Sequence, residues 1–261
     1  MVTPVALSIA GSDPSGGAGL QADLKTFHRL GVYGEAAVTL ITVQNTRGVH
    51  RVEVLDPDLV AEQIHAVVQD IPPKAAKVGA LGNRGVVEAV AKAAESFAFP
   101  LVIDPVILAK NGTPLLDAAA ERVFLEKLVP RAFLLTPNLH EASKMAGIPV
   151  HSLEEMARAA EKLVSLGAEN VLVKGGHLEG DAIDVLAARN GELRMFKAPR
   201  IATPHTHGTG CTYSAAITAE LAKGFELHKA IESAKAFVTE AIRTGPGLGG
   251  GAGPLNHFAR F

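Results

Sequence analysis

The strongest constraint on the fold is the regular alternation of short β-branched runs with amphipathic helical segments. Val5–Ala10, Ala36–Val43 and Leu101–Asp104 have the composition of buried strands, and segments such as 58–70 and 84–96 repeat apolar residues at helical spacing. Strands separated by helices need crossover connections, which make neighbouring strands parallel. The alternation therefore predicts an α/β fold, a mainly parallel central sheet covered by helices on both faces.

The rest of the chain continues this alternation. Further strands are expected at 76–81, 133–136 and 171–174, and further helices at 20–30, 117–128, 209–223 and 227–243. Arg51–Leu55 alternates polar and apolar residues, which indicates an edge strand. Asn190-Gly191 separates two β-rich runs and predicts a hairpin, and Ser152 with Glu155 predicts a capping box. Since no linker or repeat interrupts the pattern, we predict one domain over residues 1–261.

Composition excludes several classes of protein. The 25 basic and 27 acidic residues give a net charge of −2, so no overall field attracts nucleic acid or an anionic membrane. Hydrophobic residues make up 48% of the chain, which excludes a disordered protein. The apolar N-terminal run stops at Gly11 and lacks basic residues before it, so we expect no signal peptide or membrane span. The single cysteine, Cys211, favours a reducing, cytoplasmic location.

Glycine is over-represented and clustered. The 26 glycines are about 10% of the chain, against ~7% on average. They concentrate in Gly11–Gly19, in His205–Cys211 and in Gly245–Pro254. The first two clusters lead into predicted helices, where unpaired backbone N–H groups favour an anion such as phosphate. The sequence offers no physical reason for the third cluster.

The first glycine cluster resembles two known phosphate loops without matching either. Gly11 and Gly16 begin a P-loop, but Gly17 and Ala18 occupy the positions that require Lys and Ser/Thr. A dinucleotide-binding pattern also begins at Gly17, but the next strand ends in Gln44-Asn45, with no acid for a ribose. A nicotinamide-dependent oxidoreductase therefore stays a remote alternative, and a mobile surface loop is the non-functional interpretation.

The second cluster contains an H-x-H pair, His205 and His207. Two histidines at this spacing can bind a metal ion. No acidic or histidine partner follows at the spacing found in metal-dependent hydrolases, so we favour an interpretation without metal.

The residues after this pair predict an anion hole. Gly208, Thr209 and Gly210 allow the backbone to close around a small anion at the start of a helix. Cys211 occupies the first turn of that helix, where we expect the pKa of its thiol to be lowered. The thiol then suits a nucleophile or a proton acceptor, whereas a small buried filler is the non-functional alternative. A thiol hydrolase is a weaker alternative, since no histidine–acid pair can be placed beside it.

Polar residues follow three other predicted strands. Asp104 ends one strand, and Asn138 and Glu141 follow another. Carboxylate and amide oxygens suit Mg²⁺, although Asn138 suits an ordinary helix cap equally well. Lys174 ends a third strand and can meet a phosphate as a point charge. Together with the anion hole, these groups are what phosphoryl transfer requires.

Several motifs, in order along nearly the whole chain, resemble a known family. They are AGSDPSGGAGLQADLKTF, TLITVQNT, DPVILAKNG, TPNLHEA, VLVKGGH, THGTGC and GPLNHF. They are similar to the hydroxymethylpyrimidine/phosphomethylpyrimidine kinases of thiamine biosynthesis, in the ribokinase-like superfamily. The resemblance implies a three-layer α/β/α sandwich, ATP and Mg²⁺ as cofactors, and a homodimer. It implies two successive phosphorylations, of 4-amino-5-hydroxymethyl-2-methylpyrimidine and then of its monophosphate.

The resemblance also implies roles for individual residues. It places Gln44, Gly11 and Asp23 at the substrate, Gly208, Thr209, Gly210 and Cys211 at the transferred phosphate, Asp104 and Glu141 at Mg²⁺, and Lys174 at the ATP phosphates. Most of the superfamily carries Asp where Cys211 stands. Ala80 occupies a position where relatives often have a larger apolar residue, so a pyridoxal/pyridoxine kinase is the main alternative. A non-catalytic ligand-binding regulator is a third.

Overall fold

The computed structural model describes residues 3–108, 112–176 and 180–261. Two motif segments, residues 109–111 and His177, lie outside these ranges. The described strands form one sheet in the order β3-β2-β1-β4-β5-β6-β7-β8-β9. Their bounds are β1 Val5–Ser12, β2 Tyr33–Asn45, β3 Gly48–Val54, β4 Ala75–Val78, β5 Leu101–Ile103, β6 Leu134–Leu135, β7 Asn170–Val173, β8 Ala182–Ala188 and β9 Leu193–Ala198.

The sheet is mainly parallel, as the alternation predicts. From β2 to β7 every neighbouring pair of strands is parallel. β3 pairs antiparallel with β2 at one edge, and β8 and β9 form an antiparallel hairpin at the other. The predicted edge strand and hairpin are therefore confirmed. β4 ends at Val78, earlier than predicted, and Gly79 and Ala80 instead line a cleft.

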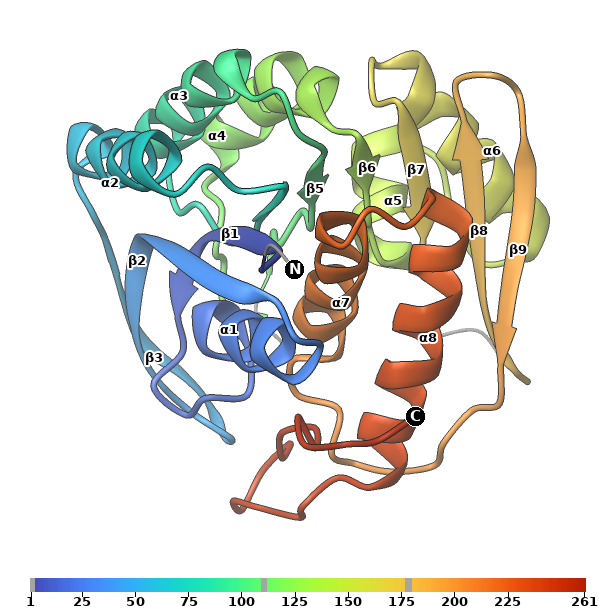
Figure 1. The fold of residues 1–261 in the computed structure, drawn as a ribbon. Coiled ribbons are helices and arrows are strands. Elements are labelled where there is room, and N and C mark those ends of the chain that lie inside the picture. The colour runs from blue at the N-terminus through green and yellow to red at the C-terminus, as the bar shows by residue number, and fades with distance from the viewer. Residues whose placement is uncertain (1–2, 109–111, 177–179) are drawn as a thin grey trace.

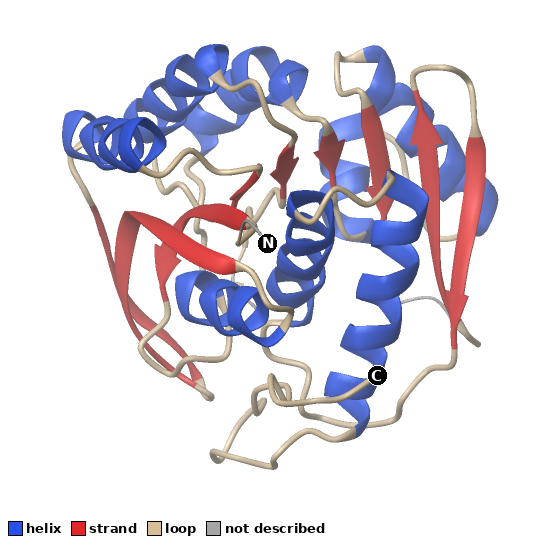
Figure 2. Ribbon diagram, viewed as in Figure 1, coloured by secondary structure: helices blue, strands red, loops and turns tan. Residues whose placement is uncertain are grey.

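Helices cover both faces of the sheet, which confirms the three-layer prediction (Figures 1 and 2). The helices are α1 Gly19–Arg29, α2 Pro57–Asp70, α3 Arg84–Ala93, α4 Ala118–Val123, α5 Leu139–Ala146, α6 Leu153–Ser165, α7 Thr209–Ala222 and α8 Leu227–Arg243. One hydrophobic core contains residues of α2 to α6, and the other contains residues of α1, α7 and α8. The predicted helix over 117–128 is α4 continued by a π-helical turn, Phe124–Leu128.

Side-chain alternation along β4 decides which core each residue joins. Ala76 and Val78 point into the core of α2 to α6, whereas Ala75 points into the core of α1, α7 and α8. Successive side chains of a strand point to opposite faces. Lys77 therefore shares the face of Ala75, and its side chain reaches Asp23 on α1.

The order of the strands in the sheet reverses at β1, which makes it the topological switch point of the sheet. β2 and β3 lie on one side of β1, and β4 and all later strands lie on the other. Loops that leave β1 and β4 therefore diverge and open a crevice at the carboxyl ends of the strands, where ligands bind in such sheets. The first glycine cluster follows β1 and lies at this point.

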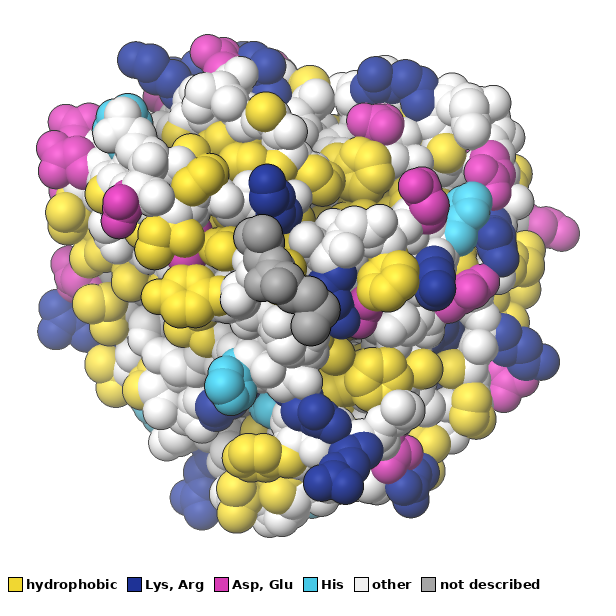
Figure 3. Space-filling model, in the orientation of Figure 1, with side chains coloured by type: hydrophobic (Ala, Val, Ile, Leu, Met, Phe, Trp, Pro, Cys, Tyr) yellow, Lys and Arg dark blue, Asp and Glu magenta, His cyan; other side chains and the backbone are white. Residues whose placement is uncertain are grey.

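The surface and the helices add two observations. On the face shown in Figure 3, basic and acidic side chains are interspersed with apolar ones. Among the described residues, no helix is both long enough and apolar enough to cross a membrane.

Candidate active site

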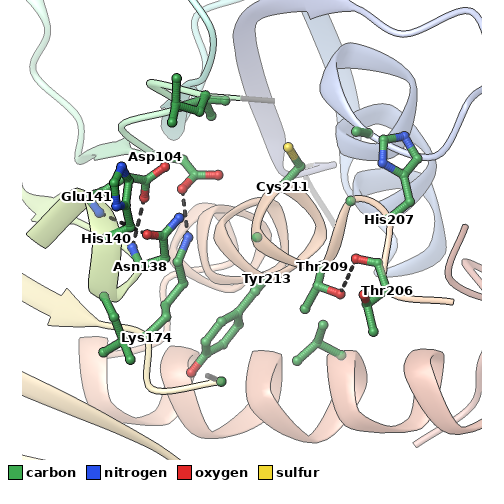
Figure 4. Close-up of a pocket in the computed structure, with 18 of the residues that line it drawn as sticks. Asp104, Asn138, His140, Glu141, Lys174, Thr206, His207, Thr209, Cys211 and Tyr213 are labelled. Carbon is green, nitrogen blue, oxygen red and sulfur yellow. Dashed lines mark hydrogen bonds and ion pairs between the residues drawn. The ribbon is translucent and has the colours of Figure 1, made fainter. Parts of the chain in front are cut away.

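A cleft of about 1620 Å³ opens at the carboxyl ends of the parallel strands. It is the region where the strand-end residues were expected to meet. Of the predicted site residues, those that line it are Gly11, Gln44, Asp104, Glu141, Lys174, Gly208, Thr209, Gly210 and Cys211. Figure 4 shows the acids and Lys174 on one side and His207 and Thr209 on the other, with Cys211 between them.

Asp23 lies beneath the cleft wall and does not line it. Its side chain has no exposed surface, and its Oδ2 accepts hydrogen bonds from Lys77 Nζ at 2.9 Å and Ser8 Oγ at 2.5 Å. Lys77, by contrast, lines the cleft. Burial alone would lower the pKa of Lys77, but its anionic neighbours, Asp23 foremost, together outweigh burial and raise it. The sequence could have flagged Lys77, since a lone charge in an apolar strand needs a buried partner.

Asp104 and Lys174 form an ion pair at the end of β5 and β7. Lys174 Nζ lies 2.7 Å from Oδ1 of Asp104, and Ser214 Oγ donates to Oδ2 at 3.3 Å. Burial would raise the pKa of Asp104, but Lys174 and Lys77 outweigh it and keep the pKa below its usual value. The pair therefore presents a fixed cation and a fixed anion at the cleft wall.

Glu141 caps the start of α5, and its carboxyl group is buried beside Asp104 and Lys174. Its side chain accepts from the backbone N–H of Asn138 at 2.8 Å, while Asn138 caps the N–H of Glu141, so the two form a capping box at the start of α5. This confirms the interpretation of Asn138 as a helix cap. Burial raises the pKa of Glu141 to about 7; Lys174 opposes this effect and Asp104 adds to it.

Asp104 and Glu141 fit the requirements of Mg²⁺. Among the described residues, no group of three or more His, Cys, Asp or Glu side chains could hold a metal by itself. Mg²⁺ in kinases is held by one or two carboxylates, waters and substrate phosphates, so a complete protein cage is not needed. Asp104 and Glu141 both supply the carboxylate oxygens that this ion prefers.

The expected low pKa of Cys211 is wrong. Withdrawal from water raises the pKa of the Cys211 thiol to about 11, and the carboxylates of Asp104 and Asp23 add to the increase. Lys77 and the backbone N–H of Gly19 act in the opposite direction but do not compensate. The thiol is therefore protonated at neutral pH, so it is a hydrogen-bonding group and not a thiolate nucleophile.

The turn that begins α7 depends on two glycines. Gly208 is the N-cap with φ +80°, and a Cβ there would lie 1.7 Å from the carbonyl oxygen of Gly17. A Cβ on Gly210 would lie 3.2 Å from Lys174 Nζ. The absence of side chains lets the first glycine cluster and the Asp104–Lys174 pair both contact this turn. Backbone N–H groups at a helix start, next to a lysine, make a site for a phosphate group.

The two histidines of the H-x-H pair have separate partners. His207 Nε2 lies 2.8 Å from Oδ2 of Asp13 in the first glycine cluster. His205 Nδ1 accepts from the backbone N–H of Gly253 in the third cluster. The sequence did not point to Asp13, because the contact joins residues 194 positions apart.

Comparisons with known proteins agree with this geometry. A family model described as phosphomethylpyrimidine kinase matches residues 13–256. The chain belongs to the phosphomethylpyrimidine kinase family. A hydroxymethylpyrimidine/phosphomethylpyrimidine kinase from Bacillus subtilis (strain 168) is 45% identical over 256 residues, which cover 97% of this chain and 94% of that protein.

Two solved structures are similar to this kinase over most of its length. The phosphomethylpyrimidine kinase of Clostridium difficile 630 is 41% identical with a TM-score of 0.81, covering 91% of this chain and 99% of its own. An ADP complex of Bacillus subtilis pyridoxal kinase is 39% identical with a TM-score of 0.90, and the match covers 99% of this chain and 98% of that chain. Kinase membership removes the oxidoreductase alternative, and the family supports a thiamine-biosynthesis kinase over a pyridoxal kinase.

The third glycine cluster of this kinase has a packing role. A Cβ on Gly251 would lie 2.1 Å from the carbonyl oxygen of Thr46, and one on Gly249 would lie 2.4 Å from its Oγ1. The segment therefore packs closely on the turn that connects β2 and β3. Gly253 accepts from the backbone N–H of His207 at 3.1 Å. All three clusters thus meet beside the cleft, which the sequence alone did not indicate.

Another buried group of the kinase escaped the sequence analysis. Asp184 Oδ2 lies 2.6 Å from Lys235 Nζ and 3.0 Å from the hydroxyl of Tyr213, and Oδ1 accepts from the N–H of Gly175. Asp184, Lys235 and Tyr213 line the same cleft as Lys174. The cluster joins β8, α7 and α8 to the turn after Lys174 and so fixes that lysine's backbone.

Proposed function

We propose that this kinase transfers the γ-phosphate of ATP to 4-amino-5-hydroxymethyl-2-methylpyrimidine and then phosphorylates the monophosphate. The observation that carries the proposal is a single cleft with the Gln44 amide in one wall and Lys174 beside the α7 turn in another. An amide both donates and accepts hydrogen bonds, as an aminopyrimidine edge requires. The relatives named hydroxymethylpyrimidine/phosphomethylpyrimidine kinase support the substrate, and the ADP complex of Bacillus subtilis pyridoxal kinase supports ATP.

The substrate lies between Gly11 and Gln44 in this proposal. Gly11 has no side chain, and a Cβ there would lie 2.5 Å from Leu40 Cδ1, so the wall is already closely packed. Asp23 acts from beneath the wall by holding the ammonium group of Lys77 in place. The hydroxymethyl oxygen then faces the start of α7.

The transfer is an in-line displacement. The hydroxymethyl oxygen attacks the γ-phosphorus, the new P–O bond forms as the β,γ-bridging P–O bond breaks, and ADP leaves. The N–H groups of the Gly208, Thr209 and Gly210 turn and the ammonium group of Lys174 stabilise the charge on the transferred group. Lys174 is kept protonated because the carboxylates of Asp104 and Glu141 outweigh burial and raise its pKa.

Cys211 orients the attacking hydroxyl. With a pKa of about 11, its thiol holds its proton at neutral pH and does not act as a strong base. Phosphoryl transfer has a loose transition state, in which the attacking oxygen needs little activation. The hydroxyl proton is therefore lost late, and it passes to an oxygen of the transferred phosphoryl group after most of the bond to phosphorus has formed.

Mg²⁺, held by Asp104 and Glu141 with the ATP phosphates, would neutralise phosphate charge when bound. We also propose a homodimer, a cytoplasmic location and one catalytic domain over residues 1–261. The single sheet supports the last proposal, and the lone cysteine supports the location.

Side-by-side turnover of the pyrimidine alcohol and pyridoxal tests the proposal. Ala80 lines the cleft and leaves room for a larger ring, which is the observation that favours a pyridoxal kinase. We expect kcat/KM for the pyrimidine to exceed that for pyridoxal by at least tenfold. A preference for pyridoxal would overturn the substrate assignment. Pyrimidine binding without ATP turnover would instead favour a ligand-binding regulator.

A further inference from the structure

His207 of the H-x-H motif contacts Gln44, the proposed substrate-recognition residue. His207 Nε2 lies 3.3 Å from Nε2 of Gln44 and 2.8 Å from Oδ2 of Asp13. The residue is 8% exposed. Its ring is confined by Gly17, since a Cβ on that glycine would lie 2.5 Å from the ring, and its backbone N–H donates to Gly253. These contacts hold the ring beside Gln44.

Hydrogen-bond balance decides which tautomer His207 adopts. Burial would raise the pKa of Asp13, but hydrogen bonds from His207 and Ser15 outweigh it and keep the pKa below its usual value. Asp13 is therefore a carboxylate and has no proton to donate. The proton in the 2.8 Å contact must be carried by His207 Nε2. That nitrogen then has no lone pair to accept from the NH₂ group of Gln44.

The other end of the Gln44 amide, its Oε1, also faces a group that cannot donate to it. Its Oε1 lies 3.2 Å from Oγ1 of Thr42, and that hydroxyl also lies 2.9 Å from the carbonyl oxygen of Ser12. A hydroxyl has one proton, and the shorter contact, to the carbonyl, takes it. The Thr42 oxygen can then only accept from Gln44. The amide can be turned, because its two ends have the same shape and only their partners distinguish them. The NH₂ group then donates to Thr42, and the oxygen accepts from the Nε2–H of His207, which Asp13 and Gln44 share in a three-centre hydrogen bond.

We infer that His207 is a positioning residue, which holds Gln44 with its oxygen toward His207 and its NH₂ group toward Thr42. Among the described residues, no second partner takes the other lone pair of the oxygen or the other N–H, and Gln44 lines the cleft. A ligand must therefore present a donor on the His207 side and an acceptor on the Thr42 side. The amino group and adjacent ring nitrogen of a 4-aminopyrimidine do so in one orientation. A 4-oxo analogue, with C=O beside N–H, presents the reverse order.

The inference rests on the proposed recognition role of Gln44, so the experiment includes His207→Met, His207→Gln and Gln44→Ala. Met and Gln have nearly the same length, but only Gln keeps an N–H near the position of Nε2. We expect His207→Met to raise KM for the aminopyrimidine about fivefold to tenfold, the usual effect of one lost hydrogen bond. The kcat and the KM for ATP should change less than twofold. His207→Gln should restore KM to within about threefold.

The 4-oxo analogue, 5-hydroxymethyl-2-methylpyrimidin-4-one, separates orientation from general damage. In His207→Met only Thr42 still orients the amide, so the preference for the amino over the oxo compound should fall about tenfold relative to the unsubstituted kinase. His205→Met is the matched control, because His205 contacts Gly253 and not Gln44. Its selectivity should be unchanged. In a Gln44→Ala background, His207→Met should have no further effect on KM.

The outcomes are distinguishable. Equal losses for both compounds, or a fall in kcat with a rise in KM for ATP, would show that His207 only supports the loop and would overturn the inference. An unchanged KM in Gln44→Ala would overturn the proposed role of Gln44 and with it the inference. If His207→Met does not fold, Thr42→Val tests the opposite end of the amide: loss of selectivity supports the inference, and wild-type selectivity contradicts it.

Discussion

Asp23 and Lys77 form an ion pair with 2.9 Å between Oδ2 and Nζ, and neither side chain is exposed. The two residues are 54 positions apart, on α1 and β4. Removal of one member of such a pair leaves an uncompensated buried charge, whereas replacement of both by apolar groups removes the desolvation cost of both. Variants of the pair can therefore separate its contribution to protein stability from the contribution of the Lys77 charge to activity.

Lys77→Met should lower the free energy of unfolding by about 3–5 kcal/mol, because Asp23 is left buried without its cationic partner. The double variant Lys77→Met/Asp23→Leu should regain most of that loss in urea unfolding. We expect its kcat/KM to stay at least tenfold below the unsubstituted kinase, because the cleft wall lacks the ammonium charge. Full activity in the double variant would show that the pair is purely structural.

Cys211→Ala should lower kcat by more than a factor of ten while the fold, followed by circular dichroism, is retained. The thiol is protonated below pH 10, given its pKa of about 11, so Cys211→Ser should retain more activity than Cys211→Ala. Alkylation of Cys211 by iodoacetamide should be slow at pH 7 and accelerate only above pH 9, because the thiolate is the reactive form. Rapid alkylation at pH 7 would contradict the raised pKa.

Glu35 should make stability depend on pH. Both carboxylate oxygens are buried without a hydrogen-bond partner in the described part of the chain, and burial, with repulsion from Asp70, raises the pKa to about 7. Between pH 4.5 and 7 the folded state keeps a proton that the unfolded state loses, so stability falls as pH rises through this window. Glu35→Gln should therefore raise the Tm at pH 8 and leave it nearly unchanged at pH 4. An equal shift at both pH values would contradict this.

Gly208→Ala should abolish most activity. A Cβ would meet the carbonyl oxygen of Gly17 at 1.7 Å, and the backbone is at φ +80°, so the phosphate turn must move. Gly224→Ala is the matched control: its φ is +87°, but nothing lies within 4 Å of the added atom. It carries the same backbone strain, about 1 kcal/mol or more, without the clash. We expect kcat in Gly224→Ala to stay within twofold; a similar loss in both would assign the effect to strain alone.

The sequence determined the elements and the place of the cleft. β-branched runs and helical periodicity are local properties, so the order of strands and helices follows from them, and the carboxyl ends of parallel strands must share one edge. This is why Asp104, Glu141 and Lys174 could be expected together, and why Asn138 could be identified as a cap. The exact ends of the strands could not be predicted where packing decides them: β4 stops at Val78, three residues before the predicted end.

Tertiary structure decided the chemistry of each group. The pKa of Cys211 depends on burial and on carboxylates from α1 and β5, and these outweigh the helix start that the sequence showed. Lys77 gained its partner, and His207 its contacts with Asp13 and Gln44, only when distant segments met. The sequence by itself thus placed the strand-end residues Asp104, Glu141 and Lys174 at one edge of the sheet, through local periodicity. Which proton each of them holds was set by charges and hydrogen bonds between segments far apart in the chain.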